Sequence, residues 1–92
     1  MSRKNNKRIV EINRYVCEFP LNENLSLFVL SKTGDSAFVC VVDGSHPTIG
    51  YNAKWIPIHS YYTTSRRGHK KRCCYIIYNG INYDITHTMY GG

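Results

Sequence analysis

The stretch that decides the fold is RCCYIIYNGINYDITHTM, residues 72–89. Its centre, Asn79-Gly80, is the strongest short signal for a β-hairpin, because a two-residue type I′ turn needs positive φ at both central positions. A turn of this length brings three pairs together on one face: Tyr78 with Ile81, Ile76 with Tyr83, and Cys74 with Ile85. We expect this face to be buried, and the face with Tyr75 and Cys73 to be more exposed.

Further strands are predicted upstream of this hairpin. Residues 25–31 and 36–42 are apolar and β-branched, and the Thr, Gly and Asp between them favour a turn, so the two segments predict a second hairpin. The unbroken apolar run from 37 to 42 indicates a strand covered on both faces. After a loop through Asn52, residues 54–64 predict another strand, in which Pro57 marks an edge or a bulge because proline donates no backbone hydrogen bond.

Residues 7–19 are ambiguous. Their apolar positions fit a helical stripe, but their content of Ile, Val and Tyr favours a strand, which we prefer. We therefore expect one mainly β domain over residues 9–92, an antiparallel barrel or sandwich of five to six strands of SH3-like or OB-like size, with at most one N-terminal helix. Residues 1–8 are expected to form a basic N-terminal arm.

Positive charge is concentrated in two segments. The chain carries 12 Lys and Arg against 6 Asp and Glu, a net charge of +6. Residues 1–14 hold five bases and one acid, residues 66–72 hold five bases and no acid, and residues 15–65 hold two bases and four acids. Segregated positive charge is typical of a surface that meets a polyanion, and charge that only aids solubility is the alternative.

The basic loop predicted at residues 65–72 is the best functional lead, because it links two strands and Gly68 permits the turn. Lys and Arg neutralise phosphates, and bases stack on exposed tyrosine rings, so the pattern predicts sequence-independent contact with single-stranded RNA or DNA. We expect one of Tyr61 and Tyr62 to face inward and Trp55 to be a core anchor. The candidate binding residues are Arg66, Arg67, His69, Lys70, Lys71, Arg72, Tyr62 and Tyr75.

The four cysteines, Cys17, Cys40, Cys73 and Cys74, match neither a zinc site nor a disulfide framework. Cys73 and Cys74 are adjacent, and neighbours on a strand point to opposite faces, so they do not easily share one metal ion. We expect no metal and no cofactor, and we expect the cysteines to act as small hydrophobic side chains.

Enzymatic activity is not expected. The sequence contains no nucleophile elbow and no phosphate-binding P-loop. Asp84 and His87 could supply an acid–base pair, but the hairpin register places them on opposite faces of the strand. A small basic ribonuclease toxin is the remaining enzymatic alternative.

The longest apolar run, residues 37–42, has six residues, whereas a membrane-spanning helix needs about 20. The basic N-terminus is followed by no apolar segment of a signal peptide. We therefore expect no membrane association and a reducing cytoplasmic location.

Two further segments, AFVCVVDG at 37–44 and KWIPIHS at 54–60, resemble a pattern in small phage and mobile-element proteins. There an apolar strand and an acidic-Gly turn lead to a W-[IL]-P-x-S segment; here residues 45–53 lengthen the connection, and Ile58-His59 precede the serine. The resemblance implies a phage-like origin and carries no catalytic residues. It supplies a second hypothesis, a phage-encoded inhibitor that binds a host nucleoprotein or defence enzyme in the host cytoplasm, of the anti-restriction or anti-CRISPR type.

Overall fold

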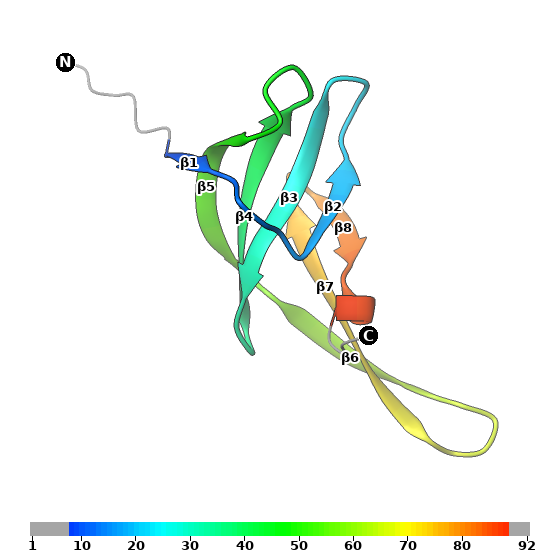
Figure 1. The fold of residues 1–92 in the computed structure, drawn as a ribbon. Coiled ribbons are helices and arrows are strands. Elements are labelled where there is room, and N and C mark those ends of the chain that lie inside the picture. Colours follow the sequence, from blue (N-terminus) through cyan, green and yellow to red (C-terminus); the bar gives the residue numbers. More distant parts are fainter. Residues whose placement is uncertain (1–7, 89–92) are drawn as a thin grey trace.

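The computed structural model describes residues 8–88, and these form a mainly β structure with one short 3-10 helix (Figure 1). The larger sheet has the strand order β1-β5-β4-β3-β2 and comprises β1 (Ile9–Glu11), β2 (Cys17–Pro20), β3 (Leu25–Lys32), β4 (Ser36–Asp43) and β5 (Ile49–Pro57). The smaller sheet has the order β6-β7-β8 and comprises β6 (His59–Thr64), β7 (Lys70–Tyr78) and β8 (Ile81–Asp84), followed by the helix η1 (Thr86–Thr88). All six strand pairings are antiparallel.

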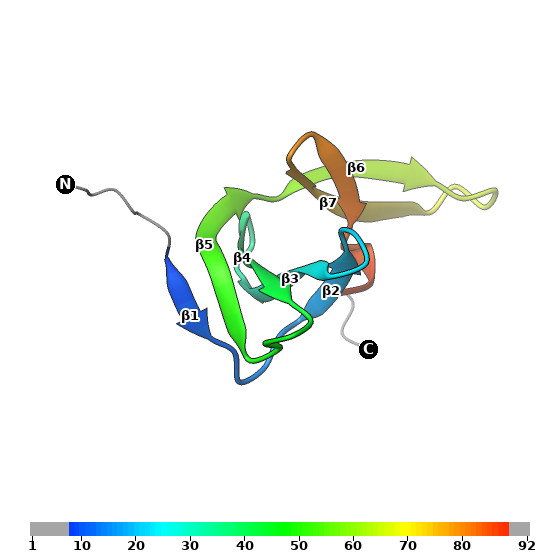
Figure 2. The same ribbon diagram turned by 90° about the horizontal axis from the view of Figure 1, so that it is seen from above.

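The prediction of a mainly β fold is confirmed, but the described residues hold eight strands rather than five or six, in two sheets that do not form a closed barrel. The preference for strand over helix near the N-terminus is also confirmed. Two short strands, β1 and β2, lie at opposite edges of the larger sheet, because residues 12–16 carry the chain across it (Figure 2). The predicted basic arm, apart from Arg8, lies outside the described residues.

The larger sheet is buried on both faces. One hydrophobic cluster lies between the two sheets, where Leu27, Val29, Ala37 and Val39 pack with Cys74, Ile76, Tyr78 and Ile85. A second cluster lies on the other face and comprises Phe28, Cys40, Val42 and Ala53. Consecutive residues of β4 thus enter different clusters, which confirms the prediction that the run at 37–42 is covered on both sides.

The chain changes sheet at Ile58, whose N–H donates to the Asp35 carbonyl at 2.8 Å. The predicted strand at 54–64 is therefore two strands, β5 and β6, which belong to different sheets. The predicted loop through Asn52 is wrong, because Asn52 lies within β5, where it adopts a positive φ of 57°. Trp55 is not a core anchor: it is 50% exposed, because its neighbour Ile56 points toward the core between the sheets.

The β7–β8 hairpin has the predicted register, with Tyr78 opposite Ile81 and Ile76 opposite Tyr83. Asn79 and Gly80 have φ values of 50° and 79°, as a type I′ turn requires. Ile85 donates its N–H to the Cys74 carbonyl at 2.9 Å, which continues the predicted pairing.

Two expectations for the faces of this hairpin are wrong. Ile81 is 54% exposed, since it follows directly on the turn, and Cys73 is only 9% exposed, since the side chain of Tyr61 from β6 lies against it.

Candidate functional site

The β6–β7 hairpin projects from the body of the protein (Figures 1 and 2). Every residue of β6 and the first three residues of β7 are exposed. The hairpin is continuous with the core at its base, where Cys74, Ile76 and Tyr78 of β7 are buried. A buried base therefore presents an exposed arm.

The tip of the hairpin is held by Ser65 and Gly68. The Ser65 N–H donates to the His69 carbonyl at 2.9 Å, and the Gly68 N–H donates to the Ser65 carbonyl at 2.9 Å. The Ser65 hydroxyl also accepts from the N–H groups of Arg67 and His69, at 3.3 and 3.2 Å. Gly68 has a φ of 81°, which favours glycine there. These bonds order the turn that carries Arg66 and Arg67.

The predicted basic loop is shorter than expected, because residues 70–72 belong to β7. The register pairs Lys70 with Thr64, Lys71 with Thr63 and Arg72 with Tyr62. Side chains alternate between faces along a strand, so the cations of β7 are divided between the two faces of the hairpin.

Of the predicted binding residues, seven are exposed and Tyr75 is half-buried. The structure brings them onto one hairpin but separates them by face. Tyr62 shares a face with Lys70 and Arg72, while Tyr75 shares the other face with Lys71. The prediction that Tyr75 lies on the same face as Lys71 is therefore confirmed.

The face that carries Tyr75 also carries two further rings, which the sequence reasoning did not select. The ring centroids of His59 and Tyr75 lie 5.2 Å apart with an interplanar angle of 24°, and those of Tyr61 and Tyr75 lie 5.9 Å apart at 53°. We call this surface, comprising His59, Tyr61 and Tyr75, the aromatic face. His59 and Tyr61 are two residues apart on β6 and therefore share a face. This spacing, combined with the register of β6 and β7, is the signal that would have predicted the aromatic face.

Tyr61 and Tyr62 are both exposed, by 47% and 67%, so the expectation that one faces inward is wrong. The physical reason is that the hairpin extends past the core, so alternation places neither ring against another layer. The adjacent Cys73 raises the pKa of Tyr61, first through an electrostatic interaction and then through a hydrogen bond. The Tyr61 phenol therefore stays neutral at physiological pH.

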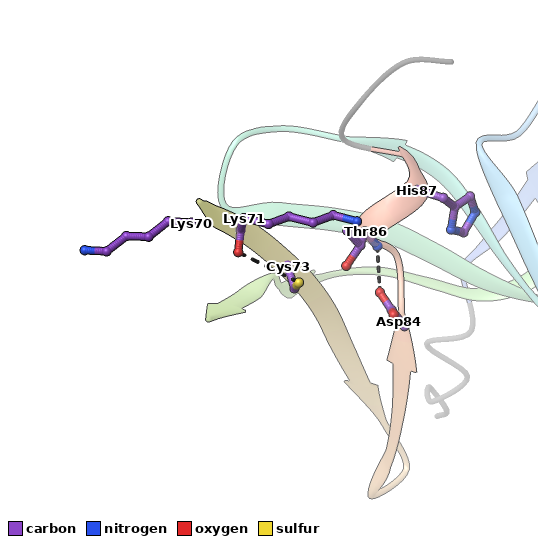
Figure 3. A pocket seen from close by; sticks show the side chains of 6 residues that line it. All are labelled: Lys70, Lys71, Cys73, Asp84, Thr86 and His87. Atoms are coloured by element: carbon purple, nitrogen blue, oxygen red, sulfur yellow. Dashed lines mark hydrogen bonds between the residues drawn. The ribbon is translucent and has the colours of Figure 1, made fainter. Parts of the chain in front are cut away.

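A hollow of about 690 Å³ lies beside the hairpin, against η1 (Figure 3). Its lining residues are Lys70, Lys71, Cys73, Asp84, Thr86 and His87. The Thr86 hydroxyl accepts from the Cys74 N–H at 2.9 Å and donates to the Cys74 carbonyl at 3.3 Å, which fixes η1 against β7. The hollow is thus built from the hairpin and the segment that follows β8.

Asp84 is the acidic residue of this hollow. Its carboxylate accepts from the Thr86 N–H at 2.8 Å. Hydrogen bonds from Thr86 lower the pKa of Asp84, and the charges of His87 and Lys71 lower it further. The expectation that Asp84 and His87 lie on opposite faces of one strand is wrong, because β8 ends at Asp84 and His87 lies in η1. Both residues line the same hollow.

Metal ligands and membrane-spanning helices were sought among the residues that the structure describes. Within residues 8–88, no three His, Cys, Asp or Glu side chains are grouped so as to hold a metal ion. Over the same residues, no helix is long and apolar enough to cross a membrane. Comparisons with protein-family models, with curated proteins and with solved structures find no match for this chain.

Proposed function

We propose that the protein binds nucleic acid, single-stranded RNA or DNA, largely independently of sequence, through the β6–β7 hairpin. One observation carries the proposal: residues 59–78 contain five Lys and Arg and no Asp or Glu, on an exposed arm that projects from the body. Phosphates are the polyanion that such a surface suits, because each neutralised phosphate releases condensed counterions.

The distribution of charge over the rest of the chain supports the same proposal. Residues 15–57, which hold β2 to β5 of the larger sheet, carry two bases and four acids. A polyanion is therefore attracted to the hairpin and not to the surface of β2 to β5. The exposed tyrosines of the hairpin add surfaces on which unpaired bases stack.

The first test replaces Arg66, Arg67 and Lys70 with Ser, since these exposed cations lie at or beside the tip. Fluorescence anisotropy with a mixed-sequence single strand is measured across salt concentrations. Each lost phosphate contact reduces the log–log salt slope by about 0.7, so the variant is expected to lose about 2.

A matched control replaces Arg14, Lys32 and Lys54 with Ser, which removes the same net charge from the body. The proposal predicts that this control keeps the salt slope of the parent. Equal losses in the two variants, or no binding by the parent at low salt, would refute it.

A second candidate function is a phage-encoded inhibitor of a host nucleoprotein or defence enzyme, of the anti-restriction or anti-CRISPR type. The exposure of Trp55, which is 50% exposed, favours it, because tryptophan is enriched at protein–protein interfaces. A pull-down from host lysate with and without nuclease separates the two candidates. A stoichiometric partner that survives nuclease favours the inhibitor, and nuclease-sensitive capture favours direct binding.

We place either activity in the cytoplasm. All four cysteines are free thiols, a state that a reducing compartment maintains.

A further inference from the structure

We infer that the aromatic face of the hairpin is the surface that holds unpaired bases, so that the ligand is a single strand and not a duplex. This inference rests on the proposed function and assigns it to one of two available faces. It shifts the base-binding role from Tyr62 and Tyr75 to a set of three rings, His59, Tyr61 and Tyr75.

The rings of the aromatic face form a continuous strip across two strands. His59 stacks on Tyr75 at 5.2 Å, and Tyr61 adjoins the same Tyr75 ring at 5.9 Å. Tyr75 is half-buried and so fixes the positions of its two neighbours, while Tyr61 keeps 47% of its surface exposed. A preorganised strip of rings offers unpaired bases a stacking surface at little cost in side-chain entropy.

The hollow beside the strip places positive charge next to these rings. Lys71 lies on the same face of the hairpin as Tyr61 and Tyr75. It lines the hollow together with Lys70 and with the carboxylate of Asp84, which pairs with Tyr75 across β7 and β8. A strand whose bases stack on the rings therefore passes Lys71, the cation of this face. The bases of a duplex are already stacked and paired, so they cannot reach the strip.

The opposite face offers a single ring. Tyr62 faces Arg72 across the strands and is 67% exposed, and among the described residues its ring contacts no other aromatic ring. The cations of this face, Lys70 and Arg72, can attract a phosphate, but one isolated ring does not make a stacking strip. Tyr61 and Tyr62 are adjacent in sequence, both exposed and on opposite faces, so they provide a matched pair of variants.

The test compares Tyr61→Ala with Tyr62→Ala by fluorescence anisotropy, using a mixed-sequence 12-nucleotide single strand and the same sequence as a duplex. We expect Tyr61→Ala to weaken single-strand binding about tenfold, within the range known for one stacked base, with the salt slope unchanged. Tyr62→Ala is expected to change affinity less than about twofold. Tyr61→Phe keeps the ring and removes the hydroxyl beside Cys73, so we expect parental affinity.

Circular dichroism and thermal melting of each variant confirm that the fold is retained. The inference is overturned if Tyr62→Ala loses as much affinity as Tyr61→Ala, or if the parent binds duplex as tightly as single strand. Its failure differs from failure of the proposed function. If the Arg66, Arg67 and Lys70 variant loses binding while Tyr61→Ala does not, the hairpin still binds nucleic acid and only the choice of face is wrong.

Discussion

Gly50 in β5 provides a sharp test of the packing between the strands that flank it. It lies opposite Val10 of β1 and Val42 of β4, and it is buried. A methyl group on Gly50 would overlap the Cys40 Sγ and would lie 3.0 Å from the Cys40 Cβ and 3.1 Å from the Val10 Cγ2. Gly50→Ala must therefore displace a thiol that is itself fully buried.

The expected loss follows from two opposing effects. Overpacking a filled core costs about 1–3 kcal/mol, and the smaller conformational freedom of alanine in the unfolded chain returns about 0.4–1 kcal/mol. We expect a net loss of about 1–2 kcal/mol in the free energy of unfolding, and a melting temperature lower by about 5–15 °C. Urea denaturation, monitored by circular dichroism, measures the loss in the free energy of unfolding.

Cys40→Ala is the matched partner of this variant, because it removes the Sγ that the new methyl meets. In the double variant the methyl occupies the space that the sulfur leaves. The two substitutions should therefore cost less together than the sum of their separate losses, by about 1 kcal/mol. Strict additivity, or a Gly50→Ala variant as stable as the parent, would refute the packing of Gly50 on Cys40.

Three further predictions concern η1, Asp84 and the thiol of Cys40. Thr86→Val leaves the buried Cys74 N–H without its acceptor, so the free energy of unfolding should fall by about 1–3 kcal/mol in urea titrations. The pKa of Asp84 is lowered by folding, so the folded chain binds fewer protons in acid than the unfolded chain. The stability that Asp84 supplies is therefore present above about pH 4 and is lost as the pH falls through its folded pKa. Asp84→Asn should flatten this acidic part of the plot of urea midpoint against pH. Burial raises the pKa of Cys40 to about 11, which leaves about one thiolate in a thousand at pH 8, so Cys40 should react with iodoacetamide only after unfolding, as peptide mass spectrometry would show.

The β7–β8 hairpin could be predicted from the sequence because its information is local. Asn79-Gly80 selects the turn, the turn sets the register, and the register places Cys74 and Ile76 in the core. The hairpin of β3 and β4 follows from the same kind of signal, a Gly and Asp turn between two apolar runs.

The change of sheet at Ile58 could not be predicted in this way. A run of strand-forming residues indicates extended backbone but does not show which sheet each part joins. The sequence therefore predicts Trp55 in the core, although the structure leaves it half exposed. Tyr61 and Tyr62 were treated as members of a covered strand, although their hairpin extends past the body.

The candidate site was predictable in its charge and not in its geometry. The cluster at residues 66–72 is visible in composition alone. The grouping of His59, Tyr61 and Tyr75 depends on the pairing of β6 with β7, which no short turn motif specifies.

A backbone-amide NMR titration of the full chain with a mixed-sequence single strand at low salt tests the central claim most directly, because it reports every surface at once. The account predicts that chemical-shift changes concentrate in residues 59–75, larger at Tyr61 and Tyr75 than at Tyr62, while the larger sheet changes little. An absence of shifts, or shifts centred on Trp55 and the larger sheet with the hairpin unaffected, would contradict it.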